Sequence, residues 1–197
     1  MSNSESNDTN IDMSALRDIP EITFIVPEET ESIEQIDKKT YNIPSEEMAR
    51  RAYSCALDYK TIVENLINKC NMFVSYAEYL ASINALACEI LLKSMLYYQQ
   101  HSNICSRIDK HYLFDLYRQL ETSVQTKIYN AFFDIEKRFS QTEFEEALKR
   151  NQDTFTLYRY AYELKAMSIE YHFIKVFRDA LIQVCKDMHL DSLFPIE

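Results

Sequence analysis

Two polar-aromatic segments hold the side chains best suited to chemistry in this chain of 197 residues. The first segment places Arg107 four residues before His111. Because histidine titrates near neutral pH, His111 could transfer a proton with the help of Arg107. The alternative is a structural histidine, whose ring bonds the preceding loop or a neighbouring helix.

The second segment contains Arg159, Tyr160, Tyr162 and Glu163. On a helix, Arg159 and Glu163 are four residues apart and can form a salt bridge. Tyr162 would share their flank and could stack on a base or on a guanidinium plane. These four residues are therefore candidate binding residues. The alternative is that the Arg–Glu pair fixes the last helix against the bundle.

An apolar segment that precedes both motifs in the chain must position them. Twenty of the 28 residues from Asn71 to Tyr98 are apolar, which predicts a helix surrounded on most sides. Glu89 and Lys93 interrupt it with a favourable i,i+4 spacing. On so apolar a helix they must reach the surface or pair internally, and we expect structural pairing.

Composition excludes several classes of enzyme. The chain has no glycine, so it lacks Gly-rich phosphate loops, dinucleotide fingerprints and nucleophile elbows. Its five cysteines form no C-x-x-C pair, and the Glu-x-x-His pairs of a bundle metal site are missing. We therefore expect no metal and no cofactor.

Charge divides the chain into an arm and a bundle. Residues 1–50 hold 12 acidic and 4 basic side chains, a net charge of −8, whereas residues 51–197 are nearly neutral. We expect residues 1–44 to form an acidic, partly disordered arm or linker with one short β-prone run at 21–27. The helical bundle would occupy 45–190, followed by a C-terminal tail at 191–197.

The bundle is predicted to be all-α. Ser45 follows a proline and starts a helix, and Ser140-x-x-Glu143 is typical of a capping box. The last apolar stripe is either one long helix or two helices that meet near residues 163–168. The pattern favours an up-and-down bundle of four to five main helices. We place helical segments at about 45–68, 71–99, 109–120, 121–138 and 157–188, and a short helix at 140–150.

Cellular context follows from the same composition. The N-terminus shows no signal peptide, and no run of about 18 uninterrupted apolar residues predicts a membrane span. Free cysteines within apolar segments suit a reducing compartment. The expectation is a cytoplasmic protein without a membrane partner.

The order of these motifs resembles the HEPN superfamily. In that family a helix containing E-x-x-x-K, here Glu89 to Lys93, precedes a helix containing H-x-L-x-x-L, here His111 to Leu116. The segment from Phe155 to Glu163 is similar to the R-Y-x-Y-E segment before the last helix of HEPN-like proteins.

The resemblance implies a bundle that is often dimeric and that serves prokaryotic antiviral defence, toxin–antitoxin or RNA-processing systems. Active members resemble metal-independent ribonucleases that use an R-x(4–6)-H motif. No histidine of this chain has an arginine at that spacing, and Arg107 is one residue too close to His111. We therefore expect a homodimer with an RNA-linked or partner-binding role, without standard ribonuclease activity.

Two alternatives stay open. In one, the protein is a non-enzymatic adaptor or inhibitor, whose acidic arm at 1–44 binds a protein partner encoded nearby. In the other, it is a metal-independent endoribonuclease with non-standard catalytic residues, Arg107 and His111 being the candidates.

Overall fold

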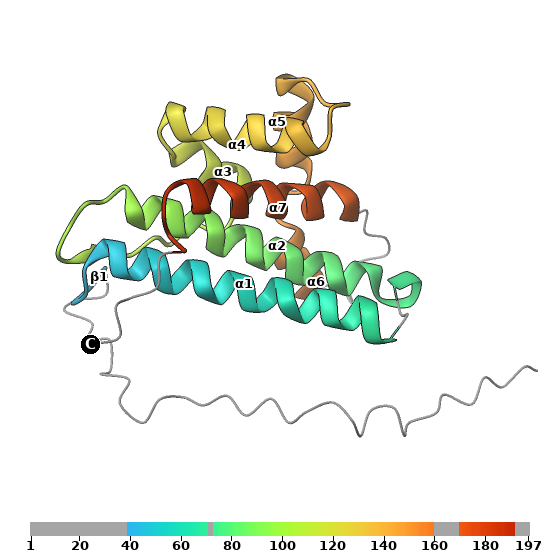
Figure 1. The fold of residues 1–197 in the computed structure, drawn as a ribbon, viewed down its shortest axis with the longest axis horizontal. Helices are drawn as coiled ribbons and strands as arrows, with labels where there is room; N and C mark the ends of the chain where they lie inside the picture. The colour runs from blue at the N-terminus through green and yellow to red at the C-terminus, as the bar shows by residue number, and fades with distance from the viewer. Residues whose placement is uncertain (1–38, 71–72, 160–169, 192–197) are drawn as a thin grey trace, which may run out of the picture. The chain divides into compact units, whose positions relative to one another are not determined.

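Helices account for most of the chain in the computed structural model, which describes residues 39–70, 73–159 and 170–191 (Figure 1). The side chains of residues 69–78, 158 and 159 are outside this description, as are the arm up to residue 38, including the run at 21–27, and the tail from 192. The all-α prediction is confirmed.

The helix boundaries agree with the predicted ones near the N-terminus and differ later. The third helix begins at Leu113 instead of 109, and the fourth ends at Ile135 instead of 138. The last stripe contains two separate helices, with 160–169 outside the described residues. The helices are α1 (Ser45–Cys70), α2 (Phe73–Tyr98), α3 (Leu113–Gln119), α4 (Thr122–Ile135), α5 (Gln141–Arg150), α6 (Thr154–Arg159) and α7 (Tyr171–Asp187).

A short antiparallel ladder, which the sequence did not predict, closes one end of the bundle. Strand β1 (Thr40–Tyr41) pairs with β2 (Cys105–Ser106), and β2 lies between the helices predicted at 71–99 and 109–120. The Arg107 N–H donates to the Lys39 carbonyl at 2.6 Å, next to the ladder. The connection between α2 and α3 is thereby tied to the chain before α1.

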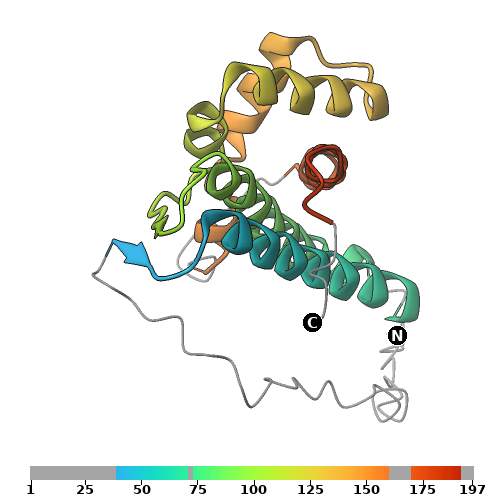
Figure 2. The same ribbon diagram turned by 60° about the vertical axis from the view of Figure 1, so that its left-hand side comes forward.

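The core is built around α2, as its apolar composition predicts. Helix α2 contacts α1, α3, α6 and α7. Figure 2 shows α7 between the α1–α2 pair and the layer of α4 and α5. Between α7 and that layer the core is aromatic: the ring of Phe144 lies 4.8 Å from Phe132 and 6.0 Å from Phe173, centroid to centroid.

One cation is enclosed in this core. The side chain of Arg178 on α7 is only 1% exposed, and its guanidinium donates to the amide oxygen of Asn84 on α2. It also donates to Asp179, with Nη2 2.6 Å from Oδ1. A buried charge is tolerated only when it is paired. Asp179 is the neighbouring residue on α7, and the bond to Asn84 links α7 to α2.

Helix ends are closed without glycine. At α5 the predicted capping box is present: Ser140 accepts from the Glu143 N–H, and Glu143 accepts from the Ser140 N–H. At α7 the His189 N–H donates to the Lys186 carbonyl, and the Leu190 N–H donates to the Cys185 carbonyl.

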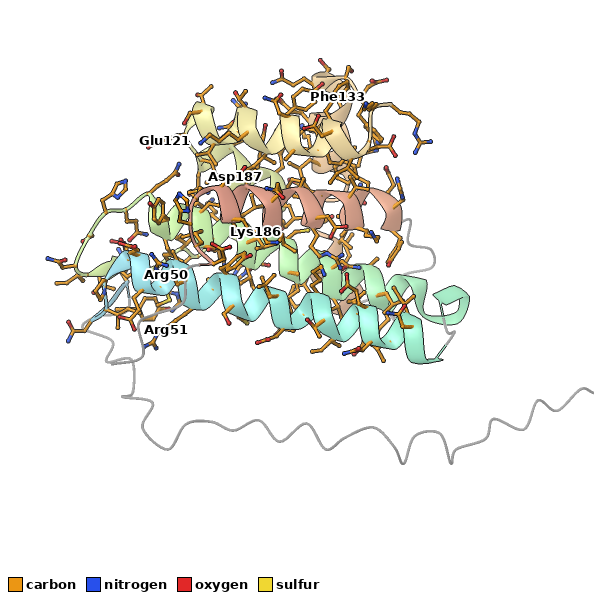
Figure 3. The ribbon with its side chains drawn as sticks, viewed as in Figure 1. Arg50, Arg51, Glu121, Phe133, Lys186 and Asp187 are labelled. Carbon is orange, nitrogen blue, oxygen red and sulfur yellow. The ribbon has the colours of Figure 1, made fainter. Side chains whose placement is uncertain are left out.

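The bond pattern at α7 is a Schellman motif, in which a left-handed residue is usually glycine. Here His189 takes that conformation, with φ of 60°, and His101 does the same after α2, with φ of 46°. On α1, Arg50 faces the end of α7 and donates to the His189 carbonyl at 3.2 Å (Figure 3). Its charge therefore complements the negative end of the α7 dipole.

Candidate functional site

Glu89 is the carboxylate around which the candidate site is built. It is buried on α2, and its Oε1 lies 2.9 Å from Nζ of Lys93, one turn later. The predicted structural pair is therefore present. A buried carboxylate needs such partners because it has lost its hydration.

His111 supplies the second partner of Glu89. Its Nδ1 lies 2.8 Å from the same Oε1, although the imidazole side chain is 62% exposed. Since a carboxylate only accepts hydrogen bonds, Nδ1 donates, and Nε2 of the neutral ring is left as the basic nitrogen. Among the described side chains Nε2 has no hydrogen-bond partner, and this arrangement of carboxylate and imidazole is that of an oriented general base.

A pocket of about 400 Å³ opens beside this histidine. One wall comes from the segment that leads into α3, and the other comes from the start of α6. The Leu113 N–H donates to the Gln152 carbonyl at 3.0 Å, and this bond holds the two walls together. The pocket is lined by Asp109, Lys110, His111, Tyr112, Asp115, Phe155 and Thr156.

Arg107 stands apart from the lining of this pocket. It follows β2, and its Nε lies 2.5 Å from Oδ1 of Asp109. Asp109 does line the pocket, so Arg107 is linked to it through that carboxylate and not beside the His111 ring. The two predicted catalytic candidates thus share a neighbourhood, but only His111 faces the pocket.

The predicted binding residues of the second motif cannot be placed. Arg159 ends α6, and its side chain lies outside the described part of the chain. The same holds for the whole of Tyr160, Tyr162 and Glu163. Their salt bridge and their stacking role stay predictions.

A second histidine–carboxylate pair was missed by the sequence analysis. Nε2 of His172, on α7, lies 2.8 Å from Oε2 of Glu136, just after α4. Arg138 donates to the same carboxylate through Nε and Nη2, both at 2.7 Å. The bonds from Arg138 and His172 lower the pKa of Glu136 to about 2, from an ordinary 4.5.

A pocket of about 630 Å³ lies beside His172. Its cations face carboxylates on the protein itself: Arg150, for example, lies 3.0 Å from Glu170. This pocket therefore balances its own charges. The sequence signal was slight, because Glu136 and His172 are 36 residues apart.

Within residues 39–70, 73–159 and 170–191, no group of three or more His, Cys, Asp or Glu side chains could hold a metal ion. In those ranges, one stretch is long and apolar enough to cross a membrane, Tyr79–Tyr98, and 67% of its most apolar part is buried in the bundle. The core helix of a water-soluble protein has the same properties.

No protein-family model, curated protein or solved structure matches this chain.

Proposed function

We propose that this protein is a HEPN-like helical bundle with an RNA-binding role in prokaryotic defence or toxin–antitoxin systems, acting in the cytoplasm as a homodimer. The observation that carries the proposal is the 2.8 Å hydrogen bond between Glu89 and His111. It joins the helix of the E-x-x-x-K motif to the segment that begins the H-x-L-x-x-L motif, at the mouth of a pocket.

The chemistry of the pocket supports RNA as the ligand. Lys110 is exposed and has no ion-pair partner among the residues that the structure describes, so its ammonium can neutralise a phosphate. Tyr112 is 47% exposed, and Phe155 lines the opposite wall. A cation beside aromatic rings is the combination that binds single-stranded nucleic acid.

Binding of labelled RNA to the purified full chain tests the proposal. Fluorescence anisotropy in EDTA should show binding to single-stranded RNA that weakens with added salt. Lys110→Ala and Tyr112→Ala should weaken it, whereas the matched controls Lys137→Ala and Phe133→Ala, both at exposed positions, should not. Absence of binding, or equal binding by all four variants, would refute the proposal.

The second candidate function is metal-independent ribonuclease activity, which the Glu89–His111 geometry favours. Nε2 of His111 would take the proton of a ribose 2′-hydroxyl, and the 2′-oxygen would attack the phosphorus. The bond from phosphorus to the 5′-oxygen would break, and that oxygen would take a proton from water. The products would be a 2′,3′-cyclic phosphate and a 5′-hydroxyl.

Product analysis separates this candidate from binding alone. RNA incubated with the protein in EDTA should acquire cyclic phosphate ends, and His111→Ala should abolish them. His101→Asn is the matched control, because asparagine tolerates the left-handed conformation of this position and His101 does not line the pocket. RNA that is bound but stays intact would rule out the ribonuclease.

The dimer in the proposal has its own test. Light scattering coupled to size-exclusion chromatography should give twice the mass of the 23.3 kDa chain. A monomer at all concentrations would remove the homodimer and leave the RNA site unaffected.

A further inference from the structure

The pocket beside His111 carries two hydrogen-bonding side chains that the proposed role of Lys110 and Tyr112 does not use. Asp115, in the first turn of α3, lines the pocket, and its carboxylate has no partner among the side chains that the structure describes. Thr156, across the pocket on α6, likewise adds a free hydroxyl there. An unpaired carboxylate at the edge of an aromatic-lined pocket favours a flat ligand with N–H donors.

The nucleobases differ in the donors that they offer to such a carboxylate. Guanine carries an N1–H and an exocyclic amino group side by side on its Watson–Crick edge, so it can donate two parallel hydrogen bonds. Adenine and cytosine offer one amino group, and uracil offers one ring N–H. A carboxylate such as Asp115 therefore discriminates in favour of guanine.

We propose that this pocket recognises one guanine nucleotide of single-stranded RNA, an inference that rests on the proposed RNA-binding function. The base lies against Tyr112 and Phe155, its Watson–Crick edge donates to Asp115, and Lys110 contacts the adjacent phosphate. His111, held by Glu89, lines the same pocket.

The other pocket does not suit the same ligand. Arg138 and Arg150, its cations, already form ion pairs with Glu136 and Glu170. A phosphate entering there would meet the negative charge of the carboxylate beside each arginine. The pocket at His111 keeps its lysine and its Asp115 carboxylate unpaired among the described residues.

The experiment compares short oligouridines that carry a single central guanosine, adenosine, cytidine or inosine, in an anisotropy titration of the full chain. The guanosine oligomer should bind about tenfold or more tightly than plain oligouridine, as expected for hydrogen bonds to a charged group. Inosine lacks the exocyclic amino group and should lose most of that gain. This arm changes the ligand, so it does not depend on the stability of any variant.

Protein variants then locate the discrimination. Asp115→Asn should reduce binding of the guanosine oligomer to the level of plain oligouridine, while the matched control Asp134→Asn, exposed on α4, should keep the preference. Tyr112→Ala should weaken binding of every oligomer by about fivefold or more, since base stacking is sequence-tolerant.

The outcomes separate the two proposals. Binding of RNA without a guanosine preference, or a preference that survives Asp115→Asn, overturns the guanine inference and leaves the RNA-binding function standing. Absence of binding to every oligomer overturns both. A preference that inosine and Asp115→Asn each remove supports the inference.

Discussion

Replacing Glu89 with glutamine should lower the free energy of unfolding by about 2–4 kcal/mol. Glu89 is buried, and the side chain of its partner Lys93 is only 15% exposed. Without the carboxylate charge, the Lys93 ammonium stays in a largely dry site with no anion. Removing one partner of a buried pair costs about 3–5 kcal/mol, and the carbonyl that glutamine retains offsets part of that loss.

Urea unfolding followed by far-UV circular dichroism measures this effect. The double variant Glu89→Gln with Lys93→Met should be more stable than Glu89→Gln alone, because it leaves no unpaired buried charge. Glu47→Gln is the matched control: Glu47 forms an i,i+4 pair with Arg51 at the surface of α1. Its loss should cost less than about 1 kcal/mol.

Equal effects of Glu89→Gln and Glu47→Gln would refute the reasoning. The single variant Lys93→Met completes the comparison. If the double variant loses as much free energy of unfolding as Glu89→Gln and Lys93→Met lose in sum, the reasoning is also refuted, because additivity would show that the charges of Glu89 and Lys93 do not interact.

Three further changes test the rest of the fold by urea or acid unfolding. Phe144→Ala should cost about 3–5 kcal/mol, because the ring is fully buried among the aromatic side chains of the core; a loss below 1 kcal/mol would contradict this packing. Ser140→Ala should cost about 1 kcal/mol through the lost cap of α5, and Thr142→Ala, in the same exposed turn, should cost less. The pKa of Glu136 is lowered to about 2 in the fold, so its stabilising contribution is present above about pH 4.5 and is lost as the pH falls towards 2. Glu136→Gln should flatten that part of the acid-unfolding curve, and an unchanged curve would count against the pair with Arg138.

The features that depend on residues close together in the chain were predicted from the sequence. Ser140 and Glu143 satisfy each other's backbone within four residues, so their spacing alone identified the start of α5. The Glu89–Lys93 pair was equally visible, since one helical turn brings the two side chains together. The central place of α2 followed from its lack of a polar face.

Contacts between segments far apart in the chain could not be predicted from the sequence. His111 and Glu89 are 22 residues apart, and Glu136 and His172 are 36 apart, so no helical period relates them. The β1–β2 ladder has two residues in each strand, too few to show an alternating pattern. Each depends on how the loops return to the bundle, which is settled by packing of the whole chain.

The left-handed residues His101 and His189 limit which sequences can share this fold. A β-branched residue or proline at either position would clash with its own backbone, whereas glycine and asparagine adopt this conformation readily. Homologous chains should therefore vary at positions 101 and 189 mainly among histidine, asparagine and glycine, whatever their chemistry. Variation of that kind would mark these two histidines as caps, and leave His111 and His172 as the histidines whose replacement informs on function.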